Sequence, residues 1–273
     1  MTRTVLITGC SSGFGRAMVP ELAARGWRVI AGVRGGRARA EGLDAEIVDL
    51  DIVDLDITSN EQRRSVVASL EGLDCLINNA GGGMFGPFEE TSESELRDIF
   101  ELNFIATLLL TRECLPLLRA GHGRIVNLSS VFGYTGFPMS SIYCASKFAL
   151  EGWSESLHHE LRGAGVKVTL VEPGGFRTRF GANVRWPETR LDAYAAQRAA
   201  MVAFRERRLM KKAKPAEIVA RLVAKLVSSD AAPVRVRVGS DARAMWLMRK
   251  WLPEAIGDRL FARMVRPLSG ERR

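Results

Sequence analysis

The segment from Thr4 to Gly15 constrains the fold more than any other part of the sequence. Thr4-Val5-Leu6-Ile7-Thr8 is a short β-branched and apolar run, which is typical of a buried strand. A turn with glycines at positions 9, 13 and 15 follows, and the apolar pattern beyond it continues as a helix. Free N–H groups and the helix dipole point at such a turn, and glycine lets a pyrophosphate approach the backbone. We therefore expect an anion-binding turn. Its G-x-x-x-G-x-G spacing departs from the G-x-G-x-x-G dinucleotide pattern, and the alternative is an ordinary tight turn.

Two later strands also end in small and polar residues. Leu73 to Ile77 leads into Asn78-Asn79-Ala80-Gly81, and Gly123 to Leu128 leads into Ser129-Ser130. Ligands of open parallel sheets bind beyond the carboxyl ends of the strands, so these residues are expected at one binding edge. Apolar runs alternate with helical patterns along the chain, which predicts an α/β fold with a parallel sheet and helices on both faces.

Tyr143 and Lys147 lie four residues apart in a segment, Ser141 to Leu150, that is typical of the start of a helix. Residues four apart share one helix face. Lowering the pKa of a Tyr from about 10 to neutrality needs roughly 4 kcal/mol, which a unit charge at ~4 Å supplies at an effective dielectric of about 20. Burial of the phenol opposes this shift, so a second cation would help. The pair predicts an acid/base; for the pair in isolation, a solvated Lys beside a half-buried Tyr is the alternative.

Composition excludes several classes of protein. The 273 residues suit one large domain, and no apolar run approaches the ~18 residues that span a membrane. The start of the chain lacks a signal-peptide pattern, so we expect a cytoplasmic protein, or one docked on the cytosolic side of a membrane. The net charge is +8, but no nucleic-acid-binding module accompanies it, so we expect no nucleic acid as partner. We also expect no metal, because the cysteines, which we expect to be buried or at a cleft, lack ligand spacing: Cys10, Cys75, Cys114 and Cys144.

Taken in order, these motifs resemble the short-chain dehydrogenase/reductase superfamily, in the subtype with a T-G-x-x-x-G-x-G turn. The matching residues span positions 4 to 178 in the family's order and spacing: Thr8 to Gly15, Asn78 to Gly81, Asn103, Ser130, Tyr143 with Lys147, and Pro173-Gly174 with Thr178. The resemblance implies a single Rossmann-type domain over residues 1–273, with a doubly wound parallel sheet. It also implies an enzyme that interconverts an alcohol and a ketone or aldehyde with a nicotinamide cofactor.

The resemblance implies a role for each matched residue. Ser130 would hydrogen-bond the substrate carbonyl oxygen, Tyr143 would act as general acid/base, and Lys147 would lower the pKa of Tyr143 and hold the nicotinamide ribose. The oxidised nicotinamide would be the second cation. Asn103 would bend its helix and hold a water of the proton relay. The expected cofactor contacts, besides Tyr143 and Lys147, are Gly9, Ser11, Ser12, Gly13, Phe14, Gly15, Arg34, Asp56, Ile57, Asn79, Ala80, Gly81, Pro173, Gly174, Phe176 and Thr178.

The end of the second predicted strand favours NADP(H) over NAD(H). In a dinucleotide fold, an acid at this point accepts the ribose 2′-hydroxyl of NAD, whereas an Arg accommodates the 2′-phosphate of NADP. Here Val33 stands where the acid is expected and Arg34 follows it, with no acid between Gly26 and Ala40. The alternative is that Arg34 is a solvated strand end.

A repeated pentapeptide follows: Ile47 to Asp51 and Ile52 to Asp56 are both I-V-D-L-D. Side chains alternate along a strand, so the two copies have opposite facing registers. We expect the sheet to take one copy and the other to form a loop. Asp56-Ile57-Thr58 matches the family's adenine contact, with Asp51-Ile52 as the competing assignment.

The last hundred residues are where substrate and partners are expected to bind. Residues 179–214 would form a lid, whose aromatic side chains suit either an apolar substrate or packing within the lid: Phe180, Trp186, Tyr194 and Phe204. Positive charge is concentrated at 205–214 and 243–273. The tail, about 241–273, is a basic amphipathic segment with Trp. We favour its packing on the lid or on a neighbouring subunit over contact with a membrane surface.

The sequence thus predicts an NADP-dependent alcohol/carbonyl oxidoreductase. The segment Tyr143 to Gly152 looks most like the hydroxysteroid and retinol dehydrogenase branches, which favours a steroid-, retinoid- or lipid-like substrate. The alternatives are a 3-oxoacyl reductase or polyol dehydrogenase of the same fold, and a non-catalytic NADP-binding sensor or scaffold docked on a membrane. We expect a homo-oligomer, either a dimer or a tetramer.

Overall fold

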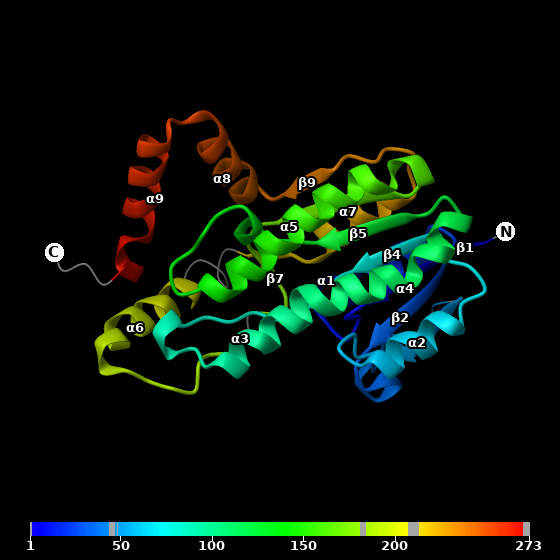
Figure 1. Ribbon diagram of the computed structural model, residues 1–273, viewed down its shortest axis with the longest axis horizontal. Coiled ribbons are helices and arrows are strands. Elements are labelled where there is room, and N and C mark those ends of the chain that lie inside the picture. The colour runs from blue at the N-terminus through cyan, green and yellow to red at the C-terminus, as the bar shows by residue number, and fades with distance from the viewer. Residues whose placement is uncertain (1, 44–46, 48, 181–183, 207–212, 270–273) are drawn as a thin grey trace.

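The computed structural model describes residues 2–43, 47, 49–180, 184–206 and 213–269, which are built around one seven-stranded parallel sheet (Figure 1). The strand order is β3-β2-β1-β4-β5-β6-β9. The strands are β1 (Arg3–Thr8), β2 (Trp27–Val33), β3 (Leu50–Asp54), β4 (Cys75–Asn78), β5 (Arg124–Leu128), β6 (Lys167–Pro173) and β9 (Arg235–Val238). This topology confirms the predicted doubly wound α/β fold of Rossmann type.

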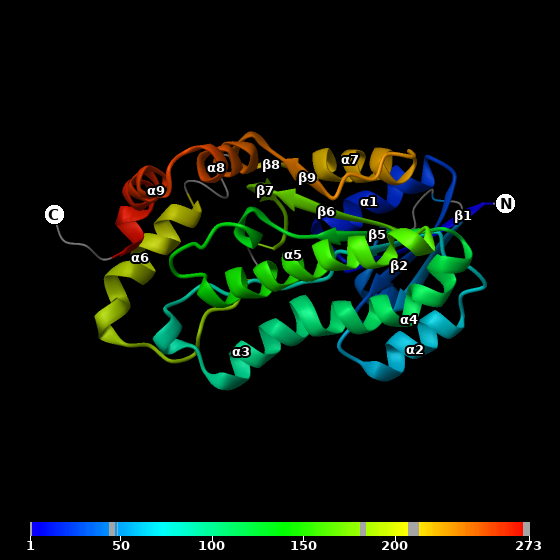
Figure 2. The ribbon, with the colours of Figure 1, turned by 45° about the horizontal axis from the view of Figure 1, so that its top comes forward.

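Helices cover both faces of the sheet (Figure 2). One face carries α1 (Gly13–Ala23) and α7 (Glu217–Val227), and the other carries α2 (Asn60–Ala68), α4 (Ala106–Ala120) and α5 (Ser141–Leu161). We call the core under α1 and α7 the first core, and the core under α2, α4 and α5 the second core. The side chains of β1 alternate between them: Val5 and Ile7 lie in the first core and Leu6 in the second. A parallel sheet buried on both faces explains why its strands read as continuous apolar runs.

The predicted strand and helix starts that carry the motifs are confirmed within a few residues. β1 is followed directly by the glycine turn and α1, and α5 begins at Ser141, so that Tyr143 and Lys147 lie in its first two turns. The cysteines are free and buried, as expected.

The repeated pentapeptide corrects one expectation. β3 takes neither copy whole: it runs from Leu50 to Asp54 and straddles both, while Asp49 has a left-handed backbone with φ 59°. Pairing with β2 sets this register, with Leu50 opposite Val29 and Asp54 opposite Val33. At this sheet edge Ile52 and Leu50 pack against the first core and Val53 against the second, so each face takes apolar residues from the strand.

Of the segments beyond β6, β9 and α7 belong to the sheet and one of its faces, whereas α6 (Ala195–Phe204) and α9 (Glu254–Ser269) lie at one end of the molecule (Figure 1). A small parallel pair, β7 (Phe176–Arg177) and β8 (Lys214–Pro215), joins the start of the expected lid to its end, and α6 lies between them in sequence. The tail forms α8 (Ser240–Trp251) and α9, with Pro253 directly before α9. The α-helix not yet mentioned, α3 (Glu93–Phe100), precedes α4 in the chain. Residues 181–183 and 207–212 of the expected lid and 270–273 of the tail lie outside the described residues.

Candidate active site

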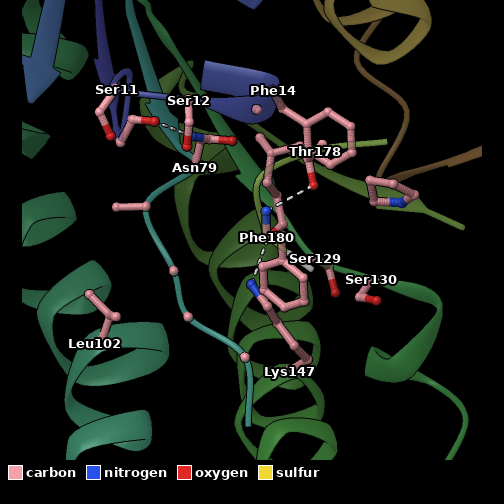
Figure 3. A pocket seen from close by; sticks show the side chains of 18 of the residues that line it. Ser11, Ser12, Phe14, Asn79, Leu102, Ser129, Ser130, Lys147, Thr178 and Phe180 are labelled. Atoms are coloured by element: carbon pink, nitrogen blue, oxygen red, sulfur yellow. Dashed lines mark hydrogen bonds between the residues drawn. The ribbon is translucent and has the colours of Figure 1, made fainter. Parts of the chain in front are cut away.

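A cleft of about 300 Å³ runs along the carboxyl ends of the central strands (Figure 3). Every residue expected to contact cofactor or substrate lines it, except Gly15 and Asn103. The structure therefore brings the expected residues together along one cleft, and their roles there stay predictions. The cleft also has lining residues that were not among the expected contacts: Leu55, Gly82, Gly83, Leu102 and Leu128. Ser129, from a strand end expected at the binding edge, and Phe180, from the expected lid, line it as well.

The glycine turn has the shape of an anion cradle. Gly9 and Gly13 have positive φ angles of 73° and 59°, which L-residues with a Cβ rarely adopt. Ser12 precedes α1 without a side-chain cap, so its hydroxyl leaves the first N–H groups of the helix to another acceptor. Gly15 acts indirectly, because a Cβ there would overlap the carbonyl oxygen of Gly9. These groups fit the pyrophosphate of a dinucleotide.

Asn79 ties the turn to the next strand. Its Nδ2 donates to the carbonyl oxygens of Thr8, at 2.8 Å, and Gly9, at 3.2 Å. In return, Thr8 Oγ1 accepts from the backbone N–H groups of Asn79 and Ala80, at 3.0 and 2.9 Å. The polar ends of β1 and β4 thus satisfy one another, which fixes the floor of the cleft.

Ser130, Tyr143 and Lys147 meet at the same cleft. The Ser130 hydroxyl, which accepts from the Phe132 N–H at 3.2 Å, lies near the Tyr143 phenol and favours a lower phenol pKa. Lys147 Nζ donates to the carbonyl oxygen of Leu128 at 2.9 Å. Figure 3 shows Lys147 rising from its helix beside Ser129 and Ser130, with Phe180 in front. Burial lowers the pKa of Lys147 to about 8, because desolvation disfavours the charged form.

The Tyr143 phenol is buried, and burial raises its pKa above the ordinary value, whereas the neighbouring Ser130 hydroxyl acts in the opposite direction. The predicted lowering toward neutrality is therefore not a property of the Tyr143–Lys147 pair in this structure. Desolvation of the phenol outweighs the opposing effect of Ser130, and the Lys147 ammonium donates to the Leu128 carbonyl. Operation near neutral pH stays a prediction that needs the additional cation.

Asn103 lies behind the cleft rather than in its wall. It is buried in a π-helical stretch, Glu101–Ile105, that joins α3 to α4, so the predicted irregularity of the helix is present. Its amide clamps Gly82 by accepting from the N–H at 2.8 Å and donating to the carbonyl at 2.9 Å. It also donates to Ser146 Oγ at 3.0 Å. Asn103 therefore holds the glycine loop that lines the cleft.

A buried ionic chain leads away from Lys147, and sequence reasoning missed it. Glu151 follows Lys147 by four residues and accepts from Arg235 Nε at 3.0 Å. Arg235 Nε is also 3.3 Å from Glu172, whose other oxygen is 2.9 Å from Arg237 Nε. Burial and the Glu151 charge raise the pKa of Glu172 to about 7. The four-residue spacing of Tyr143, Lys147 and Glu151 was the available signal.

The Glu151 carboxylate raises the pKa of Lys147 against the effect of burial. In Glu151→Gln, the ammonium loses this support, so its pKa falls further and it releases its proton at a lower pH. We expect the alkaline limb of kcat/KM to move to lower pH, as measured in a pH–rate profile. Glu155→Gln is the matched control, because Glu155 lies at the surface and its carboxylate accepts a hydrogen bond of 2.8 Å from the same Arg235. Equal profiles for both variants would contradict the coupling.

Comparison with known proteins places the cleft in a family. The family model for short chain dehydrogenase matches residues 3–189, which hold the glycine turn, Ser130, Tyr143 and Lys147. The chain belongs to the short-chain dehydrogenase family. It is an oxidoreductase that acts on CH–OH groups. Among curated relatives, an uncharacterised oxidoreductase YbbO of Escherichia coli is 40% identical over 190 residues, which cover 67% of this chain and 70% of that protein. A 3-ketodihydrosphingosine reductase of Bacteroides thetaiotaomicron is 32% identical over 92% of this chain and 93% of that protein.

Solved structures agree in fold. A short-chain dehydrogenase from Streptomyces avermitilis matches with a TM-score of 0.79 at 32% identity, covering 98% of this chain and 97% of that one. A Burkholderia phymatum member solved with NAD has a TM-score of 0.77 at 25% identity, with 91% and 92% covered. A Burkholderia cenocepacia member solved with NADP has a TM-score of 0.77 at 24% identity, with 95% and 97% covered. The member solved with NAD, at 25% identity, supports a nicotinamide cofactor for this chain.

Proposed function

We propose that this protein is an NADP(H)-dependent oxidoreductase that interconverts an alcohol and a ketone or aldehyde on an apolar, lipid-like substrate. The observation that carries the proposal is a second cavity of about 1100 Å³ that opens beside the cleft and shares Ser130 and Tyr143 with it. Aromatic and aliphatic side chains dominate its wall: Phe85, Phe132, Phe137, Phe180, Val184, Phe204, Met245 and Met264. A cavity of this size and lining suits a large apolar molecule whose reacting carbon lies next to Tyr143.

Each residue of the cleft has a chemical task in this proposal. A bound nicotinamide supplies or removes the hydride. Ser130 donates to the substrate oxygen as charge develops there, and Tyr143 gives or takes the hydroxyl proton. Lys147, held by the Leu128 carbonyl, presents its charge to the cofactor ribose and to the phenol. The glycine turn binds the pyrophosphate, with Thr178 beside it: a Cβ on Gly13 would lie 3.2 Å from the Thr178 Cβ.

The NADP preference rests on Arg34 at the end of the cleft. Arg34 is exposed, lines the cleft with Asp56 and Ile57, and has Val33 rather than an acid before it. The nearby Asp54 is engaged, because its Oδ1 accepts from the Gly35 N–H at 2.8 Å. An Arg in this position binds a 2′-phosphate, whereas a 2′-hydroxyl needs an acceptor.

A substrate panel tests the proposed class. We expect kcat/KM with NADPH to be highest for long-chain or polycyclic ketones and aldehydes, lower for 3-oxoacyl thioesters and lowest for polyols. A polyol or a short polar carbonyl at the top of the panel would contradict an apolar substrate. Binding of NADPH with no turnover on any carbonyl would favour the alternative of a non-catalytic sensor.

Phe180 offers a sharper test of the same cavity. Its ring lies 5.5 Å from that of Tyr143, between centroids, and it packs against Gly83, so that it separates the cleft from the larger cavity. Phe180→Ala removes this partition, and we expect kcat/KM to fall about tenfold for slim chains and to change less for bulky polycyclic substrates. Phe88→Ala, an exposed aromatic outside both cavities, is the control. A uniform loss across all substrates would contradict a role in selection.

We also propose a homo-oligomer, because members of this family generally form oligomers. The exposed side chains of Ile105, in the π-helical stretch, and Phe148, on α5, offer apolar contacts for a second subunit. Light scattering of Phe148→Arg tests this proposal, and we expect the variant to be a monomer.

Cytoplasmic location is a further proposal. Among the described residues, no helix is both long and apolar enough to cross a bilayer.

A further inference from the structure

Large apolar side chains are exposed on the two C-terminal helices, α8 and α9. Five of them stand out among the described residues: Trp251 at 70%, Leu247 and Ile256 at 48%, Leu260 at 43% and Met264 at 36% exposure. Figure 1 shows α9 at one end of the molecule and α8 between α9 and the end of β9. Isolated exposed apolar residues need no explanation, but a cluster on consecutive helices indicates a surface that binds something.

Both helices arrange these residues as a stripe. Ile256, Leu260 and Met264 are spaced by four residues along α9, and Leu247 and Trp251 are spaced by four along α8. Residues four apart share a helix face. The inward face of α9 is a different one, because Phe261, Val265 and Leu268 pack with α6 residues and Phe137. The exposed stripe of α9 is therefore additional to the face that the protein itself uses, and on α8 the buried residue is Ala242, outside the stripe.

Basic residues border both stripes. Arg259 and Arg263 follow Ile256 and Leu260 by three residues, and Arg243 and Lys250 lie four before and three after Leu247. Among the residues that the structure describes, none of these four forms an ion pair with a carboxylate. The acids of α9, Glu254 and Asp258, lie two residues from Ile256 and so on another face. Lys250 also lies over the Trp251 ring, 5.4 Å from its centroid.

This combination discriminates between occupants. A second copy meeting this surface about a two-fold axis would bring its own unpaired basic residues against these. An anionic bilayer instead offers a hydrocarbon boundary for the stripe and negative headgroups for its basic border. Trp is also the residue that favours the membrane–water interface.

We propose that the surface of α8 and α9 formed by Leu247, Trp251, Ile256, Leu260 and Met264, with its basic border, docks the protein on an anionic lipid bilayer. This reverses the preference drawn from the sequence, which placed the tail on the lid or on a neighbouring subunit.

The docking surface adjoins the substrate cavity. Met264, the last residue of the α9 stripe, also lines the cavity, as does Met245 of α8. An apolar path thus leads from the surface toward Tyr143, so that a docked enzyme takes its substrate from the lipid phase. This last step rests on the proposed function, whereas the docking itself does not.

Vesicle sedimentation tests docking without any turnover. We expect the full chain to bind vesicles of phosphatidylglycerol and phosphatidylcholine, to bind pure phosphatidylcholine at least tenfold more weakly, and to release from the anionic vesicles as salt is raised. Arg259→Gln with Arg263→Gln should weaken binding by about fivefold per charge. Arg112→Gln with Arg119→Gln, on α4, makes the same change of charge elsewhere and should have little effect.

The apolar stripe has its own variants. Leu247→Ser with Trp251→Ser should weaken vesicle binding at least tenfold, whereas Phe88→Ser, at a residue that is 63% exposed outside the surface, should not. An unchanged melting temperature shows that each variant is folded. The single variant Trp251→Phe, which keeps a large apolar ring at this position, should bind vesicles as the parent protein does. Equal binding to neutral and anionic vesicles, or no binding, would overturn the proposal. So would an oligomer that Leu247→Ser with Trp251→Ser dissociates, because a second copy would then be the occupant.

Discussion

Replacing Tyr143 by Phe is expected to abolish measurable turnover, a loss of at least about 10²- to 10⁴-fold, while NADPH still binds. The phenol is the group placed to exchange a proton with the substrate, because it lines both the cleft and the larger cavity beside Ser130. The ring itself stays, so the edge contact with Phe132, at 6.1 Å, and the contact with Phe180 are kept. Steady-state kinetics and fluorescence titration with NADPH measure the two halves of this prediction.

Tyr134→Phe is the matched control. Its hydroxyl donates to the carbonyl oxygen of Ala242 at 2.8 Å, and it lines neither the cleft nor the larger cavity. Losing that hydrogen bond should lower the free energy of unfolding by about 1 kcal/mol and leave kcat near its original value. Retained activity in Tyr143→Phe would falsify the acid/base assignment, and loss of NADPH binding would show that the ring placement had changed.

Arg34→Asp together with Val33→Ser should turn the cofactor preference from NADP toward NAD. The guanidinium is removed from the 2′-phosphate and a carboxylate is placed against it. A hydrogen bond to a charged group is worth about 1.5–3 kcal/mol, so we expect the NADP:NAD ratio of kcat/KM to fall by at least about 10- to 100-fold. Steady-state kinetics with NADP and with NAD, measured over the same series of substrate concentrations, give this ratio.

Val33→Ser alone separates the charge from the packing. Val33 is fully buried in the first core, so this change lowers stability but keeps Arg34 in place. We expect the single variant to prefer NADP as the parent does. If the double variant also leaves the ratio unchanged, the 2′-phosphate is not recognised by Arg34.

Some features of the site could be predicted because they depend on local chain geometry. The glycine turn needs a strand before it and a helix after it, and the spacing of apolar residues between positions 4 and 23 predicts both. The Tyr143–Lys147 spacing has one meaning on a helix, and α5 does start at Ser141. Ser130 and Asn79 follow buried strands, and the ends of parallel strands share one edge.

Other features needed contacts between distant segments. Phe180 reaches the cleft only because the chain after β6 folds back over Gly83 and Tyr143. Glu151 becomes part of an ionic chain because Arg235 comes from β9, more than eighty residues away. β3 straddles the repeated pentapeptide because pairing with β2, rather than the repeat itself, sets its register.

For this protein, periodicity and motif spacing alone predicted the sheet architecture, the glycine turn between strand and helix and the residues that line the cleft, since each depends on a few neighbouring residues. Burial decided the rest. Whether a phenol becomes harder or easier to ionise, and whether an amphipathic helix turns its second apolar stripe inward or to the surface, depends on what other parts of the chain pack against it. Here the packing desolvates Tyr143 and leaves the stripe of α8 and α9 exposed.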